Sequence, residues 1–286
     1  MRNLFRTYRH SLYNYESVFP YAILGVVGGV ASALIILAFD AAIVVAAAAW
    51  GVDGLAEDFE SLPRWLHFAL PAAGGLLLGL VFSAIKLEHR DVGIVHVLSR
   101  MDSHYGILPW RNALVQFVGG AFALATGQSG GREGPGVHLG AATNSLLGQS
   151  IRLPNNSLRV LIACGTAGGI AVAFNTPLAG VIFAMEVIVA EYTVIGFIPV
   201  ILSAVSAMAI SRAFDRGDPL IAFSGAELTS LWEVPFILLL GLLCGAVVAL
   251  FIVISKHTAR LAQWPVAVRF TVAGVVTGTL ALAAPQ

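Results

Sequence analysis

Long runs of apolar residues, separated by short charged segments, make up most of this chain. Charge-free stretches cover 17–39, 65–85, 112–131, 160–185, 192–211, 234–255 and 270–286, and the first of them continues past Asp40 through 41–52. A helix needs about 20 apolar residues to cross the hydrocarbon core of a bilayer. The pattern therefore predicts an all-α integral membrane protein with about seven strong hydrophobic segments.

One polar, glycine-rich stretch interrupts this pattern. Residues 127–140 read Gly-Gln-Ser-Gly-Gly-Arg-Glu-Gly-Pro-Gly-Val-His-Leu-Gly and lie between two apolar pieces. Glycine and proline at this density do not continue a helix, so we expect the backbone to break near membrane depth. Such a break is tolerated only where it is buried in protein or lines a watery cavity. We therefore expect 92–99 and 134–150 to form shorter helices, with Pro135 in the first turn of the second.

Composition and charge support a membrane location and exclude other classes. The chain of 286 residues is 58% hydrophobic and 11% charged, whereas a soluble domain carries about 25% charged residues. Its formal net charge is zero, which gives no indication of nucleic acid as a partner. Cys164 and Cys244 lie inside apolar runs, and we interpret them as small core residues without a disulfide or metal role.

The distribution of charge predicts the orientation in the cell membrane. Arginines near the N-terminus precede a polar, aromatic stretch, so residues 1–16 are predicted to be a retained interfacial helix rather than a signal peptide. The segment 86–104 carries Lys86, Arg90 and Arg100, whereas the segment 51–64 is mainly acidic. Cationic residues favour the cytoplasmic side. The charge distribution therefore predicts a multi-pass protein whose N-terminus lies in the cytoplasm.

The break at 127–136 is also the best candidate for chemistry. A helix that begins inside the membrane presents free N–H groups and the positive end of its dipole, which is a ready anion site. Glu133 stands where such an anion would lie, and its carboxylate could occupy the site and leave it on protonation. An intramembrane glutamate is costly enough to suggest a function. The alternative is that Glu133 pairs with Arg132 in a loop.

Two motifs of the chain resemble those of the CLC family of chloride channels and chloride/proton antiporters. Residues 131–135 are similar to the GREGP signature of that family, and 173–180 resemble its AFN-x-PLAG segment, about forty residues further on. Residues 165–170, Gly-Thr-Ala-Gly-Gly-Ile, fit the stretch before it. The resemblance runs over essentially the whole chain.

This resemblance implies a fold, a ligand and a set of site residues. It implies an inverted-repeat fold with broken, re-entrant helices, in which 17–262 form the first transmembrane half and 263–286 begin a second half that is truncated here. It also implies a homodimer with one pathway per subunit, no cofactor, and chloride or a related anion as the transported ligand. Glu133 would be the gate, and the anion site would involve Val92, Gly93, Ile94, Arg132, Glu133 and Gly134.

The chain departs from the family pattern at the start of the first short helix. The family motif GSGIP corresponds here to 91–95, Asp-Val-Gly-Ile-Val, so Val92 replaces a serine hydroxyl. Backbone N–H groups remain available, and an anion other than chloride becomes an open alternative. We interpret Asp91 as a partner of Arg90.

A second departure concerns proton coupling. Proton-coupled relatives carry two adjacent acids after the PLAG segment, whereas this chain has Glu186 followed by Val187, which cannot relay a proton. This favours passive, channel-like conduction, with a proton-coupled exchanger as the alternative. Glu191, four residues after Val187, is a substitute acid if the helix continues.

Two functions from other classes compete with anion transport. Residues 127–130 match the GxSG pattern of rhomboid-type intramembrane proteases, in which Ser129 would need a histidine within hydrogen-bond reach. His138 and His257 are the candidates, and neither placement is compelling, so we do not expect an enzyme. The remaining alternative is an assembly or regulatory subunit with no transport role.

Overall fold

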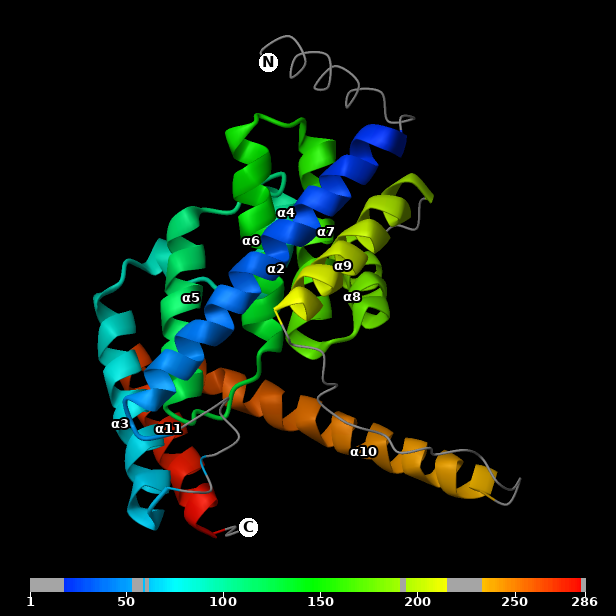
Figure 1. Cartoon of the computed structure of the whole chain (residues 1–286). Coiled ribbons are helices and arrows are strands. Elements are labelled where there is room, and N and C mark those ends of the chain that lie inside the picture. The colour runs from blue at the N-terminus through cyan, green and yellow to red at the C-terminus, as the bar shows by residue number, and fades with distance from the viewer. Residues whose placement is uncertain (1–17, 53–58, 60–61, 191–193, 215–232, 284–286) are drawn as a thin grey trace.

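A computed structural model describes residues 18–52, 59, 62–190, 194–214 and 233–283, and every regular element in these ranges is helical (Figure 1). The predicted helix at 1–16 and Glu191 lie outside the described residues. The elements in chain order are α2 Val18–Ala48, α3 Arg64–Ala84, η2 Leu87–His89, α4 Gly93–Ser103, α5 Trp110–Ala125, α6 Glu133–Ser150, α7 Asn155–Phe174, α8 Pro177–Phe183, η3 Ala184–Val189, α9 Val194–Ala213, α10 Val234–Thr258, η5 Ala259–Gln263 and α11 Val266–Ala283.

The described residues contain six helices that are long and apolar enough to cross a membrane, not seven. The predicted segment 112–131 is shorter than expected, because α5 has 16 residues and ends at Ala125. The predicted segment 160–185 is divided. Asn175 adopts a left-handed conformation with φ of 55°, which ends α7, and Pro177 then begins α8. The two short helices, α4 and α6, are present as predicted.

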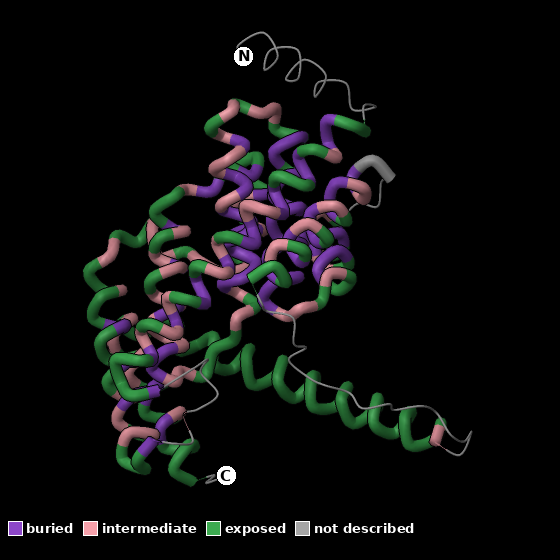
Figure 2. The backbone as a smooth tube through the Cα atoms, viewed as in Figure 1, coloured by how far each residue is buried: buried purple, intermediate pink, exposed green. Residues whose placement is uncertain are grey.

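Helices α6 and α7 form the centre of the molecule. Helix α7 packs against α6, α9, α2 and α8, and α2 crosses the front of this group with α9 beside it (Figure 1). Buried residues are concentrated in this upper part of the bundle (Figure 2). Helix α7 is buried along almost its entire length, as expected for a helix surrounded by protein rather than lipid.

Glycine residues allow α6 and α7 to touch through their backbones. A Cβ atom added to Gly140 would collide with the carbonyl oxygen of Gly165, and one added to Gly165 would collide with that of Gly140. One turn away, a Cβ on Gly169 would collide with the carbonyl oxygen of Gly136. Small residues at helix contacts are the usual basis of close association in membranes, since lipid provides no hydrophobic drive between helices.

A buried polar network holds the central helices together. Asn144 on α6 donates from Nδ2 to the carbonyl oxygen of Gly28 at 3.2 Å and to Ser32 Oγ, both on α2, at 2.8 Å. Ser32 Oγ in turn donates to the carbonyl oxygen of Gly165 on α7 at 3.2 Å. On the opposite side, Ser203 Oγ of α9 donates to the carbonyl oxygen of Cys164 at 2.6 Å. Four helices are therefore joined by buried hydrogen bonds, which are stronger away from solvent.

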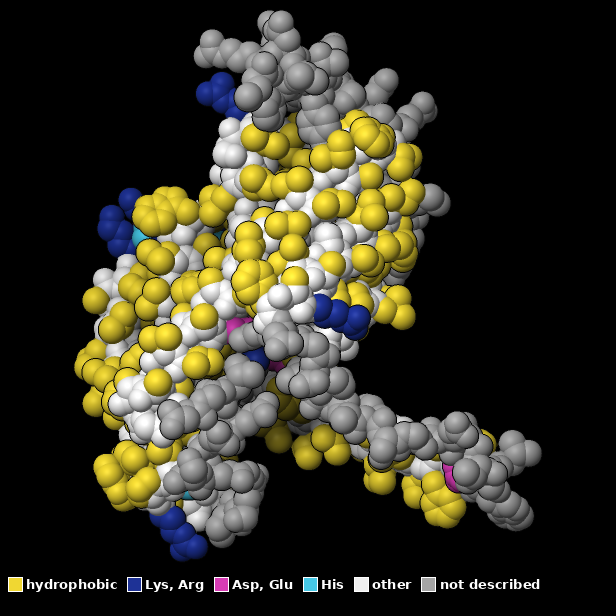
Figure 3. Space-filling model, in the orientation of Figure 1, with side chains coloured by type: hydrophobic (Ala, Val, Ile, Leu, Met, Phe, Trp, Pro, Cys, Tyr) yellow, Lys and Arg dark blue, Asp and Glu magenta, His cyan; other side chains and the backbone are white. Residues whose placement is uncertain are grey.

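The outer helices expose apolar side chains. Helices α3 and α11 pack closely, with the rings of Phe82 and Phe270 stacked at 5.2 Å. Helix α10 extends away from the bundle, and it has no buried residue. Hydrophobic side chains cover much of the face in Figure 3, where charged groups are few. A surface of this kind suits contact with lipid or with further protein.

The contact between α6 and α7 predicts the effect of one substitution. We expect Gly140→Val to destabilise the protein by at least about 1–3 kcal/mol, because the new side chain would overlap a backbone carbonyl that has no room to move. Gly245→Val on α10 is the matched control, since open space surrounds Gly245. Thermal unfolding of both purified variants in detergent measures the difference. Equal unfolding temperatures would contradict the backbone contact.

Candidate anion-binding site

Helix α6 begins inside the polar glycine-rich stretch, as the sequence predicts. Glu133 is its first residue, and the first intrahelical bond runs from the N–H of Gly136 to the carbonyl oxygen of Arg132 at 2.8 Å. The first N–H groups of a helix have no partner within it, and Pro135 has no N–H to leave unpaired. The amides around Gly134 and the positive end of the α6 dipole therefore provide the N–H donors and partial positive charge that the predicted anion site requires.

The carboxylate of Glu133 folds back toward Gly131. A Cβ atom added to Gly131 would collide with the Glu133 carboxylate, so only glycine leaves room for the acid in this position. Arg132 does not pair with Glu133 among the interactions of the described residues. Its Nη1 lies 3.8 Å from Oδ1 of Asp40 on α2, whose side chain is 2% exposed. The alternative pair between Glu133 and Arg132 is therefore not formed among the described residues.

The ion pair between Arg132 and Asp40 indicates how deep in the membrane the site lies. Helix α2 has 31 residues, which corresponds to about 46 Å, whereas a hydrocarbon core is about 30 Å thick. Asp40 lies eight residues before the end of α2, or about 12 Å along its axis. A bilayer centred on α2 would thus place Asp40, Arg132 and the start of α6 within its apolar region. The rest of α2 carries no charged side chain.

The start of α4 forms the second part of the predicted site. Val92 is extended at the helix N-cap, and Gly93 has φ of +76°, a conformation that side-chain-bearing residues rarely adopt. Ile94 packs against the cluster that contains Val137 of α6, so the two helices lie together near their starts. An open cavity of about 370 Å³ is present here, lined by Arg90, Asp91, Val92, Val95, His96 and Ser99.

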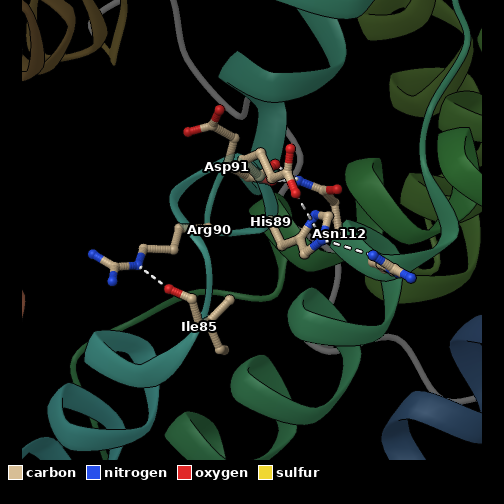
Figure 4. Close-up of polar contacts among 7 residues, drawn as sticks. Ile85, His89, Arg90, Asp91 and Asn112 are labelled. Carbon is tan, nitrogen blue, oxygen red and sulfur yellow. Dashed lines mark hydrogen bonds and ion pairs between the residues drawn. The ribbon is translucent and has the colours of Figure 1, made fainter.

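A set of hydrogen bonds fixes the loop that leads into α4 (Figure 4). Asn112 at the start of α5 donates from Nδ2 to the carbonyl oxygens of Glu88 at 3.0 Å and Asp91 at 2.9 Å. Arg90 donates from Nε to the carbonyl oxygen of Ile85 at 2.8 Å. The predicted pair between Arg90 and Asp91 is wrong, because the Arg90 guanidinium is engaged by backbone carbonyls instead. Sequence reasoning missed Asn112, a buried polar residue in the first turn of an apolar helix.

The positions considered for proton coupling lie on and after η3. Val187 is partly buried and packs against the cluster at the start of α4 and α6, whereas Glu186 is exposed. Helix η3 ends at Val189, and Ala190 is left-handed with φ of 55°. Glu191, the substitute acid considered from the sequence, lies outside the described residues, so its role stays a prediction.

The arrangement required for a serine protease is not formed by the candidate residues. Ser129 is exposed, while His138 is fully buried and bonded through Nε2 to Nδ1 of His96 at 2.9 Å. His257 is exposed near the end of α10 and bonds the carbonyl oxygen of Val253 at 2.8 Å. Among the described residues there is also no cluster of three or more side chains suited to a metal ion.

These features define a membrane transport fold built from broken helices. The family model described as voltage gated chloride channel matches residues 74–286, and the chain belongs to this family, the CLC family. The family is one of transporters and channels rather than enzymes.

Curated relatives and solved structures agree with this assignment. A ClcB-like protein of Ralstonia nicotianae is 34% identical over 82% of this chain and 57% of its own length. The H(+)/Cl(-) exchange transporter ClcA of Vibrio cholerae is 35% identical over 70% of this chain and 44% of its own length. The chain thus spans about half the length of the curated relatives it matches.

Two solved structures show the same fold at low sequence identity. A CLC-type fluoride/proton antiporter has a TM-score of 0.73 at 22% identity, covering 93% of this chain and 65% of that one. A slow cyanobacterial chloride/proton antiporter has a TM-score of 0.69 at 22% identity, covering 90% of this chain and 63% of that one. The predicted CLC-type all-α fold is thereby confirmed.

The pair between Asp40 and Arg132 predicts a loss of stability on substitution. We expect Asp40→Asn to destabilise the protein by up to about 3 kcal/mol, because it leaves the Arg132 charge inside the bundle without its counter-charge. Glu88→Gln is the control, since Glu88 is exposed where it approaches His89 and should matter by less than about 0.5 kcal/mol. Thermal unfolding in detergent compares the two. An Asp40→Asn protein as stable as the control would contradict the buried pair.

Proposed function

We propose that this chain carries the gated anion pathway of a proton-coupled anion exchanger. The observation that carries the proposal is the start of α6, where Glu133 is the first helical residue and its carboxylate lies against Gly131, next to Arg132 and its buried partner Asp40. Membership in the CLC family supports anion transport as the activity. The ClcA relatives are named as H(+)/Cl(-) exchangers, which favours coupled exchange over the passive conduction predicted from the sequence.

Glu133 acts as the gate in this proposal because its carboxylate and the transported anion compete for the same amides. An ionised carboxylate over the start of α6 satisfies the helix dipole and excludes another anion. Protonation removes that attraction, so the side chain moves away and the amides around Gly134 become free for the anion. Proton binding and anion binding are thereby linked at one site.

The anion is held mainly by backbone groups. Val92 offers no hydroxyl, so the amides of Gly93 and Ile94 at the start of α4, with those near Arg132 and Gly134, supply the hydrogen bonds. A site built from backbone N–H groups suits a small, spherical halide. Chloride is the first candidate from the names of the relatives, and fluoride is the second from the solved antiporter.

The assembly follows from the same family membership. We propose a homodimer in the cell membrane with an anion pathway in each subunit, and with the N-terminus and the segment 86–104 on the cytoplasmic side. Residues 17–262 form the first half of the pathway domain, and 263–286 begin the second. The exposed apolar surface of α10 supports a further protein or lipid contact there.

Substitution of the gate tests the function. In vesicles containing the purified protein and loaded with chloride, we expect Glu133→Gln to move chloride at a rate that varies less than twofold between pH 4.5 and pH 7.5, because glutamine imitates the protonated acid at every pH. The original protein should become faster at low pH. Chloride efflux and external pH are recorded together, with fluoride tested in parallel.

The matched control is Glu88→Gln, an exposed acid away from the start of α6. It should retain the pH dependence of the original protein. The same pH dependence in Glu133→Gln would count against the gate. Chloride efflux from the original protein without any proton movement would contradict coupled exchange and support the passive conduction that Val187 suggests.

A further inference from the structure

Two histidines that the anion site does not use meet in the interior of the bundle. His96 lies in the first turns of α4, and His138 lies in the second turn of α6. Nδ1 of His96 is 2.9 Å from Nε2 of His138, and His96 is 6% exposed whereas His138 is fully buried. Two directly bonded imidazoles in the interior need a physical explanation, because burying polar nitrogen atoms carries a desolvation cost.

The hydrogen bonds determine which nitrogen atoms of the two histidines donate and which accept. Nε of Arg100 lies 3.3 Å from Nε2 of His96, and arginine can only donate, so that nitrogen accepts. In a neutral His96 the proton then lies on Nδ1 and is donated to Nε2 of His138. The proton of His138 must therefore lie on its own Nδ1, which is buried and has no hydrogen-bond partner in the described residues. This series of hydrogen bonds therefore ends at the Nδ1–H of His138, a buried donor with no acceptor among the described residues.

The two ends of the pair lie in different surroundings. His96 lines the open cavity at the start of α4, together with Val92 of the anion site. His138 is on the same helix as Glu133 and follows it by five residues, which is about 7.5 Å along the axis. The pair therefore connects a water-accessible cavity with the buried helix that carries the gate.

The charged groups around the pair are few. The field at His96 arises from Arg100 on α4, Asp91 in the loop before it and His104 at its C-cap, and the field at His138 arises from His96. The helices and η3 packed against α4 and α6 contribute Asp40, Arg111, Arg159 and Glu186 as their charged side chains. Of these, Asp40 pairs with Arg132 and Arg111 contacts His89.

We propose that His96 and His138 form a proton relay between the cavity at the start of α4 and the interior near the gate. The inference rests on the proposed function, because it gives a path for the coupled proton in a chain with valine at position 187. A proton from water binds Nε2 of His96 as Arg100 withdraws. The Nδ1 proton of His96 passes to Nε2 of His138, and the Nδ1 proton of His138 leaves to an interior water. One positive charge is thereby transferred inward. Both rings end neutral, with the proton on Nε2 instead of Nδ1.

A purely structural pair makes a different prediction. Glutamine in place of His138 retains an acceptor for the Nδ1 proton of His96, so it preserves the bond between the helices. It cannot take a proton at one atom and release another from the opposite side of a ring. Proton flux relative to anion flux thus separates a relay from a structural hydrogen bond.

The test measures the number of protons moved per chloride in vesicles that contain the purified protein. We expect His138→Gln and His96→Gln each to lower this ratio at least tenfold. His257→Gln is the control, an exposed histidine near the end of α10 that should leave the ratio unchanged. An unchanged ratio in a folded His138→Gln protein would overturn the relay. Chloride movement without protons in the original protein would overturn the relay but not the anion pathway.

A second measurement does not depend on transport. It tests the relay even if no chloride moves, an outcome that would refute the proposed function but not the relay. The exchange of the His138 Nδ1 proton with deuterated water is followed by nitrogen-15 NMR of histidine-labelled protein in detergent. The relay predicts exchange at least tenfold slower in His96→Gln than in the original protein, because the path from the cavity is cut. Equal exchange rates would overturn the relay whatever the transport assay gives.

Discussion

The structure depends on the need to satisfy the unpaired backbone amides at the start of α6. The amides around Gly134 have no intrahelical partners, and an isolated set of such groups in lipid would cost several kcal/mol each, so they require a charged or polar occupant. Glu133 supplies a carboxylate at this place, and Gly131 leaves the space for it. Asp40 holds Arg132 to one side of the site. This local geometry is the basis of the proposed anion site.

The remainder of the bundle keeps that helix end in position. Backbone contact between α6 and α7 through Gly140 and Gly165, with the hydrogen bonds of Asn144, fixes α6 against α2 and α7. Asn112 fixes the loop before α4 in the same manner. The site is thus built from short helices held by glycine contacts and a few buried amides. The contact of His96 with His138 joins α4 to α6 and adds a titratable link between the cavity and the gate helix.

Much of this arrangement could be predicted from the sequence, because hydrophobic length and glycine density report directly on helices in a membrane. The broken start of α6, its proline and the position of Glu133 followed from local backbone preferences. Contacts between distant residues could not be predicted in this way. Nothing in the sequence around Arg132 indicated Asp40, more than ninety residues earlier. The left-handed Asn175 divided the segment 160–185, which hydropathy alone made continuous. Arg90 was assigned to its neighbour Asp91, although its guanidinium donates to the backbone carbonyls of Ile85 and Ser83 in this fold.

The central claim is that the free amides at the start of α6 hold the transported anion when the Glu133 carboxylate is absent from them. The most direct measurement is anomalous diffraction from crystals of the Glu133→Gln protein grown in bromide, a heavier substitute for chloride. The account predicts a bromide ion within hydrogen-bond distance of the backbone amides of residues 132–134. Bromide found only elsewhere, with these amides facing bulk water or covered by another side chain, would contradict it.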